Sequence, residues 1–172
     1  MDELQRLLTK LDQSLDSGGQ LIQSYDGVKD DFSRVSQRQG NLASRHIVFD
    51  FDKYTNRYSK ALSENDFGEA NLTIQEADGE MDMVERRYDE AAHKLTEFES
   101  SYDVLSKHDV PREEFIDEKS NIDKSFELGD YDDVTRMCNS SINSMKATFE
   151  SFEGARDAID IAKSAIEKGK KA

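Results

Sequence analysis

The chain has 172 residues, with 37 Asp and Glu against 23 Lys and Arg, and a formal net charge of −14. A negative surface repels phosphate backbones, which excludes nucleic acid as an expected partner, and no apolar run approaches the ~20 residues of a membrane-spanning helix. Apolar residues make up only 35% of the chain, so composition by itself leaves disorder open, and a single Cys excludes an intramolecular disulfide. We expect a cytoplasmic protein without membrane insertion.

The first predicted helix runs up to Gly40. Its apolar residues recur at alternating steps of three and four, the heptad spacing that keeps one seam of a helix against partner helices. Gly40 predicts the stop, and Asn41 or Ser44 is suited to cap the next helix. The stripe, with Ser14 and Gly18 in the same register, consists of Leu4, Leu7, Leu11, Leu21, Tyr25, Val28, Phe32 and Val35.

A short helix and a second long one follow. The short helix is predicted from Ile47, Phe51, Tyr54, Tyr58 and Leu62 at helical spacing. Asp66 then stands where an N-cap accepts hydrogen bonds from free N–H groups. The second long helix carries the clearest stripe, in which every position is apolar or aromatic: Phe67, Ala70, Ile74, Ala77, Met81, Val84, Tyr88, Ala91, Leu95, Phe98, Tyr102 and Leu105.

The same order then recurs. Asp109-Val110-Pro111 breaks the helix, with Pro111 suited to a first helical position, and Phe115, Ile116, Ile122 and Phe126 predict another short helix. Asp130 is the expected cap of a third long helix, with Gly129 before it. The stripe of that helix comprises Tyr131, Val134, Cys138, Ser141, Met145, Thr148, Phe152, Ala155, Ile159, Ala162 and Ile166. We therefore predict an all-α fold of five helices, ordered long, short, long, short, long.

These segments form an internal repeat of about 64 residues. We expect one helical-repeat domain, 1–172, made of a partial repeat 1–40 and repeats 41–108 and 109–172, and the missing first short helix favours a fragment of a longer array. A helix of ~60 Å followed by a return of ~30 Å predicts a staggered row of three-helix bundles that share long helices. The competing interpretation breaks the long helices near Gly18-Gly19 and Gly79 and folds them into a compact bundle.

Two resemblances accompany this pattern. The segments 65–77 and 128–141 resemble the turn and second helix of a tetratricopeptide repeat, with a small residue, an aromatic and another small residue at characteristic spacing. The match covers a minor part of each unit, and it lacks the small residue of the first helix and the closing Pro. The staggered arrangement is similar to that of spectrin-type repeats, although the period here is much shorter. The tetratricopeptide resemblance implies a helical-hairpin interaction module rather than a catalytic activity.

Candidate chemistry is sparse. Glu90 and His93 match the Glu-x-x-His spacing of di-iron helical bundles, but the heptad places both on the outer side of the helix. Asp50 and Asp52 resemble the start of a calcium loop that does not continue. Cys138 stands in the seam, where Cys behaves as a small hydrophobe. We therefore expect no catalytic residue, no bound metal and no cofactor.

The two ends of the chain are unusually apolar. In the staggered arrangement neither end has a neighbouring helix, and uncovered stripes of this width typically mark association surfaces. We predict a non-catalytic scaffold or adaptor that acts through helix–helix contacts with a protein partner or with itself. The alternatives are that these ends fold back on the body, that the protein is a structural oligomer subunit or chaperone-like clamp, or that it is a carboxylate-rich metal-binding bundle. The predicted interaction surface comprises Leu4, Leu7, Leu8, Leu11, Leu15, Ile159, Ile161, Ala162 and Ile166.

Overall fold

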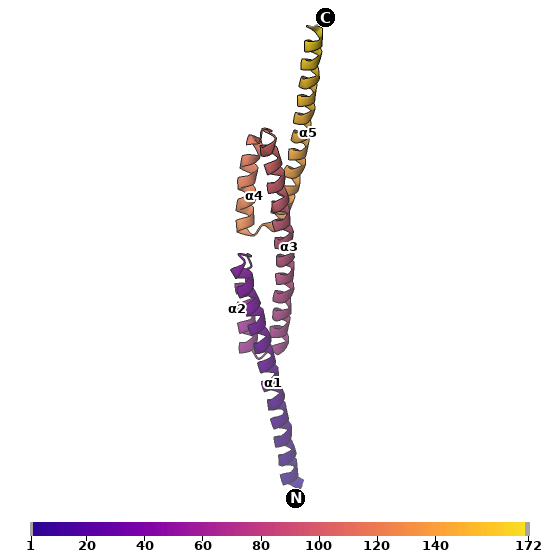
Figure 1. Ribbon diagram of the computed structural model, residues 1–172. Helices are drawn as coiled ribbons and strands as arrows, with labels where there is room; N and C mark the ends of the chain where they lie inside the picture. The colour runs from indigo at the N-terminus through magenta and orange to yellow at the C-terminus, as the bar shows by residue number, and fades with distance from the viewer. Residues whose placement is uncertain (1, 171–172) are drawn as a thin grey trace. The chain divides into compact units, whose positions relative to one another are not determined.

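The computed structural model describes residues 2–170, and within them the chain is all-α (Figure 1). The predicted order of long, short, long, short and long helices is confirmed. The chain divides into two compact units, with the boundary between Glu85 and Arg86, inside the third helix. The helices are α1 (Asp2–Ser44), α2 (Asp52–Ser63), α3 (Phe67–Lys107), α4 (Ile116–Leu128) and α5 (Tyr131–Gly169), with a short 3₁₀ helix, η1 (Glu113–Phe115), before α4.

The first unit joins the C-terminal half of α1, the helix α2 and the first part of α3. Val28 and Val35 of the predicted α1 stripe are buried, as are Ala70 and Ile74 of α3. Phe32 lies between Val28 and Val35 on α1. Its ring stacks on that of Tyr58 of α2 with 3.7 Å between centroids, and on that of Phe51 with 5.7 Å. Because the apolar seams of three helices meet here, each contributes only a narrow stripe.

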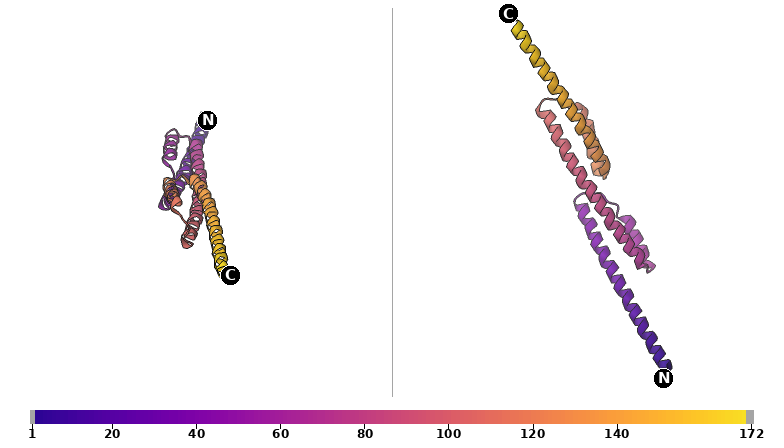
Figure 2. Two further views of the ribbon diagram at one scale, coloured as in Figure 1. Left: turned by 90° about the horizontal axis from the view of Figure 1, so that it is seen from above. Right: turned by 90° about the vertical axis from the view of Figure 1, so that its right-hand side faces the viewer.

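The second unit joins the rest of α3 to α4 and the first half of α5. In the views of Figures 1 and 2, α4 runs beside the first half of α5. Phe98 of α3, Ile122 of α4 and Val134 of α5 are fully buried. Tyr88 meets the ring of Tyr131 edge-on at 5.4 Å between centroids, and this aromatic contact lies at the start of α5.

Both long helices that lead into a short one end in the same way. His46 and Asp109 adopt left-handed backbone angles, with φ of 60° and 57°. The next residue turns back in each case: the N–H of Ile47 and that of Val110 each donate a 3.0 Å hydrogen bond to a helix carbonyl five residues earlier. This geometry is typical of a helix C-cap that satisfies free carbonyls, and the apolar residue after it is buried.

The first helix differs from its predicted bounds. It continues through Gly40 to Ser44, so neither Asn41 nor Ser44 caps a new helix, and that prediction was wrong. Ile47 lies in the connection rather than on α2, which begins at Asp52, although its side chain is buried as its place in the stripe predicted. A glycine in a helix lowers its stability without ending it, and here the following turn decides the boundary.

Two of the other predicted boundaries need correction. The Asp66 carboxylate does cap α3, where it accepts a 2.9 Å hydrogen bond from the N–H of Glu69. Asp130 precedes α5 but makes no side-chain cap hydrogen bond, so its predicted capping was wrong. Pro111 lies in the loop before η1 rather than in the first turn of α4, which starts at Ile116.

The long helices are not broken at their glycines. Gly18 and Gly19 lie inside α1, and Gly79 lies inside α3. A Cβ atom added at any of these three positions would meet nothing within 4 Å, so no close packing explains why glycine stands there. The alternative in which the helices break at these positions is therefore wrong.

Candidate interaction surfaces

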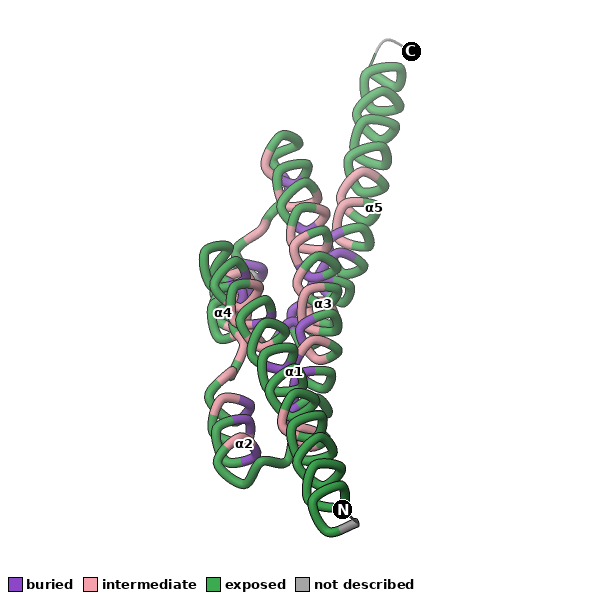
Figure 3. Tube along the Cα trace, turned by 90° about the horizontal axis from the view of Figure 1, so that it is seen from below, coloured by how far each residue is buried: buried purple, intermediate pink, exposed green. Residues whose placement is uncertain are grey.

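The N-terminal half of α1 carries a row of exposed leucines. Between residues 3 and 27 every residue except Gly18 is exposed, and Figure 3 shows this stretch in green. The predicted residues Leu4, Leu7, Leu8, Leu11 and Leu15 are between 53% and 68% exposed. At about 100° per residue all five point to one side of the helix. We call this row, with Ile22 at its end, the α1 face.

The C-terminal half of α5 is exposed in the same way. Ile159, Ile161 and Ile166 are 52%, 71% and 58% exposed, and Ala162 is exposed as well. Ile161 lies about 200° around the helix from Ile159, so it belongs to the opposite side. We call the remaining row the α5 face, which consists of Phe152, Ala155, Ile159, Ala162 and Ile166.

Sequence reasoning missed one member of the α1 face. Ile22 is 65% exposed, and helix geometry places it in line with Leu4 and Leu15. The heptad register placed Leu21 on the seam, and Leu21 is 55% exposed. The helical angle, measured from Leu4 onward, was the signal that could have found Ile22.

The residues considered for metal binding stand apart. The His93 ring is 70% exposed, and its Nε2 pairs with Glu97 at 3.2 Å, one turn along the same helix. Asp50 accepts a 3.2 Å hydrogen bond from the N–H of Asp52, which is a local turn contact. Among residues 2–170, the described part of the chain, no three His, Cys, Asp or Glu side chains form a group that could hold a metal ion.

Cys138 is fully buried in the second unit. Burial raises the pKa of its thiol to about 11, and the charge of Asp123 adds to the shift. The thiol therefore stays protonated at neutral pH and behaves as a small apolar side chain.

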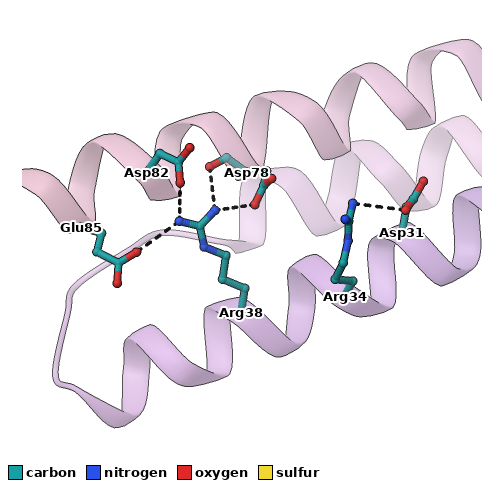
Figure 4. Close-up of polar contacts among 6 residues, drawn as sticks. All are labelled: Asp31, Arg34, Arg38, Asp78, Asp82 and Glu85. Atoms are coloured by element: carbon teal, nitrogen blue, oxygen red, sulfur yellow. Dashed lines mark hydrogen bonds and ion pairs between the residues drawn. The ribbon is translucent and has the colours of Figure 1, made fainter.

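A cluster of ion pairs holds α1 against α3 in the first unit (Figure 4). Arg38 donates from one guanidinium nitrogen to Asp78 at 2.6 Å, and from the other to Asp82 at 2.5 Å and to Glu85 at 3.2 Å. These hydrogen bonds raise the pKa of Arg38 above its already high value. Arg45 makes a further ion pair with Glu85.

The corresponding place in the second unit is apolar. At the sequence spacing of 63 or 64 residues, Ser101 corresponds to Arg38 and Phe149 corresponds to Glu85. His108, the equivalent of Arg45, meets the Phe149 ring edge-on at 5.1 Å. Beside it lies a hollow of about 240 Å³ that opens to solvent and is lined by Ser101, Val104, Leu105, Met145, Lys146, Phe149 and Glu150. The sequence pattern did not predict this hollow, which lies where Ser101 stands in place of the longer arginine side chain.

Comparison with known proteins identifies no relative. No protein-family model matches the chain, and no curated protein or solved structure is significantly similar to it. A search of the described residues also finds no helix that is both long enough and apolar enough to cross a membrane.

Proposed function

We propose that the protein is a non-catalytic helical scaffold or adaptor of the cytoplasm, which binds protein partners by helix–helix contact. The observation that carries this proposal is the α1 face, where Leu4, Leu7 and Leu11 are each more than half exposed on a helix of 43 residues. Burying apolar surface is worth about 25 cal/mol per Å², so a helix that covers this row gains affinity from it. The docking mode is a helix laid along another apolar helix face.

We also propose that the chain is built from staggered three-helix repeats, in which α3 belongs to two consecutive bundles. The left-handed residues that end the long helices, His46 and Asp109, support this arrangement, because they are separated by one repeat period. Asn65 and Gly129, which are left-handed at the ends of the short helices, are separated in the same way. Small-angle scattering tests this: an elongated profile supports the stagger, and a near-spherical monomer contradicts it.

A photo-crosslinking experiment tests the scaffold function. The residue Leu7 on the α1 face, or Ile159 on the α5 face, is replaced by a photoreactive amino acid in cells that express the protein. Leu128, 70% exposed on α4 in neither face, is the matched control position. We expect light-dependent protein adducts from the two face positions and none from Leu128. No adduct from either face, or equal adducts from all three positions, would contradict the proposal.

The exposed faces also favour one alternative, a subunit of a structural oligomer, because a second copy of the chain can cover them. No observation among residues 2–170 favours the carboxylate-rich metal-binding bundle, since Glu90 and His93 lie on a solvent-exposed helix side.

A further inference from the structure

We propose that two copies of the chain associate head to tail, with the α5 face of one copy packed in parallel against the α1 face of the next. This inference deepens the proposed scaffold function and depends on it, because it names the partner as a second copy of the same chain. It follows from a contact between long helices that the molecule already makes twice.

In each unit, the C-terminal half of one long helix packs against the N-terminal half of the following one. Tyr25 of α1 meets Phe67 of α3 edge-on at 6.3 Å in the first unit. Tyr88 of α3 meets Tyr131 of α5 edge-on at 5.4 Å in the second unit. The two contacts involve equivalent positions of the sequence repeat. Residues further along both helices also come together in each unit, Arg38 with Asp78 and Ser101 with Met145, so the paired helices run in the same direction.

The residues of these two contacts recur every 63 or 64 positions, and the next residue at this spacing lies on an exposed face in each case. One side of the contact is occupied by Tyr25 and then Tyr88, and the next residue at this spacing is Phe152 of the α5 face. The other side is occupied by Phe67 and Tyr131, and the preceding residue at this spacing is Leu4 of the α1 face. The α5 face therefore matches one side of an existing contact, and the α1 face matches the other.

Buried residues of the two units also correspond, at a spacing of 63 or 64 residues, to residues of the exposed faces. Ile74 and Cys138 are buried on the N-terminal halves of α3 and α5, and Leu11 is their equivalent on α1. Val35 and Phe98 are buried on the opposite side of the contact, and Ala162 is their equivalent on α5. The residues that fill the core within each unit thus have exposed apolar counterparts at both ends.

The two faces complement each other in side-chain size. The α1 face is built from leucines, whereas Ala155 and Ala162 leave space between the larger residues of the α5 face. Large side chains that pack into gaps left by small ones allow helices to approach closely. Rows of leucine also pack against each other in coiled coils. Size therefore permits the pairing of unlike faces, and the repeat spacing of the contact residues selects it.

Charge does not oppose the contact, although the chain as a whole is at −14. Residues 3–24 hold three acidic and two basic side chains, a net charge of −1. Residues 152–170 hold four basic and four acidic side chains, a net charge of zero. The acidic excess lies elsewhere, so these segments can approach without strong like-charge repulsion.

The contact pairs two different surfaces, so it leaves one face of each kind open at the ends of every assembly. Such a heterologous contact continues into chains of copies unless the rotation closes a ring. Among the helices described between residues 2 and 170, none is left to cover the side of this contact as α2 and α4 do within the units. We therefore expect weak association, in the range of about 10–100 μM, which lies toward the weak end for protein pairs.

Sedimentation velocity of the whole chain and of three single variants tests the proposal. Ile159→Asp places a charge in the α5 face, and Leu11→Asp places one in the α1 face. Ile161→Asp is the matched control, because it changes the same residue type two positions away on the opposite side of α5. All three residues are more than half exposed, so the fold does not depend on them, and circular dichroism verifies that.

We expect the weight-average mass of the wild type and of Ile161→Asp to rise at least twofold from 19.6 kDa between ~1 and ~500 μM. Ile159→Asp and Leu11→Asp each remain monomeric alone. Their mixture forms a dimer and nothing larger, because one variant retains an intact α5 face and the other an intact α1 face.

Three results would overturn the proposal. A wild type that stays at 19.6 kDa over the whole range excludes self-association. A dimer of Ile159→Asp alone shows that α1 faces pair with each other, and a loss of assembly in Ile161→Asp shows that the opposite side of α5 is used. In the first case, crosslinked adducts between this chain and other proteins would still support the scaffold function, so the two proposals fail separately.

Discussion

The two units join their long helices with opposite chemistry at equivalent positions. In the first unit, Arg38 binds three carboxylates across the contact between α1 and α3. In the second unit, Ser101 takes the place of Arg38, and His108 packs on Phe149 beside an apolar hollow. Ion pairs therefore flank the apolar seam in the first unit, whereas mainly apolar side chains flank it in the second.

The positions where the helices end, and the sides by which they pack, are the same in both units, whereas the side chains beside the contact differ. The left-handed turns at His46 and Asp109 and the buried stripes recur in both units, so they set where helices end and which sides meet. The flanking positions are free to vary between ions and apolar groups.

The largest effect is expected from the buried stripe itself. Phe98→Ala removes a fully buried ring from the second unit and should lower the free energy of unfolding by about 3–5 kcal/mol. Val35→Ala, the equivalent change in the first unit, removes two methyl groups and should lower it by about 2 kcal/mol. Urea denaturation followed by circular dichroism measures both. Losses below ~0.5 kcal/mol for either variant, which are typical of surface substitutions, would contradict a shared core frame.

The two units should lose stability at different alkaline pH values, because their buried titrating groups differ. Burial raises the pKa of Cys138 to about 11 from 9.0. The folded state therefore favours the protonated thiol, and the stability that this adds is complete below pH 9 and lost as the pH rises to about 11. In the first unit, burial raises the pKa of Tyr54 and that of Tyr58 above 10.0. The stability contributed by these protonated tyrosines is therefore lost only above pH 10.

Urea denaturation between pH 8 and 11 checks this assignment. Cys138→Ala should abolish most of a decline of about 2–3 kcal/mol that starts near pH 9 in the wild type. Tyr58→Phe is the control, since it should leave the decline between pH 9 and 10 unchanged and weaken only the part above pH 10. An equal decline in Cys138→Ala and the wild type would rule out the thiol as its cause.

The ion cluster is expected to have an intermediate effect. Arg38→Gln leaves Asp78 and Asp82 without this shared cation, and should lower the free energy of unfolding by about 1–2 kcal/mol at low salt. Arg34→Gln is the matched control, because Arg34 pairs with Asp31 on its own helix and is 72% exposed (Figure 4). We expect less than ~0.5 kcal/mol for that change.

Thermal denaturation at low and at high salt further distinguishes the destabilisation caused by Arg38→Gln from that caused by Arg34→Gln. The difference between them should shrink at high salt, since screening weakens the cluster and hardly affects an exposed pair that contributes little. If Arg34→Gln destabilises as much as Arg38→Gln, the cluster does not hold α1 against α3.

The smallest expected effect is an increase in stability. Ser101→Met should fill part of the 240 Å³ hollow in the second unit and raise the free energy of unfolding by about 0.5–1 kcal/mol. The same substitution at exposed Ser151, on the outside of α5, gives the baseline for a change from serine to methionine in a helix. Equal effects at both positions would show that the hollow offers no room for the new side chain.

Sequence periodicity predicted the helices and the buried stripe because both depend on the same local repeat of apolar residues. Val28, Val35, Ile74, Ala77 and Phe98 are buried as their register required. The helix ends were less predictable. Gly40 lies inside α1 because the turn at His46, with the hydrogen bond from Ile47 to Leu42, ends the helix instead.

The exposed faces could be predicted as apolar rows, but their angular limits required helix geometry. Ile161 was assigned with Ile159 to one wide apolar stripe, yet the two lie on opposite sides of α5. The Arg38 cluster and the hollow beside Phe149 were not predictable from one helix at a time, because each depends on which residues of two helices come level with one another.

Hydrogen–deuterium exchange over a range of chain concentrations tests the docking faces most directly. A helical segment of about 20 residues without tertiary contacts is marginally stable in water, so residues 3–22 of α1, which end before the Tyr25–Phe67 contact, should exchange fast in the monomer. We predict that residues 4–22 of α1 and 152–166 of α5 become protected together as the concentration rises from ~1 to ~500 μM, while the rest of the chain does not change. Protection that is independent of concentration, or that appears in only one of the two segments, would contradict the proposed docking.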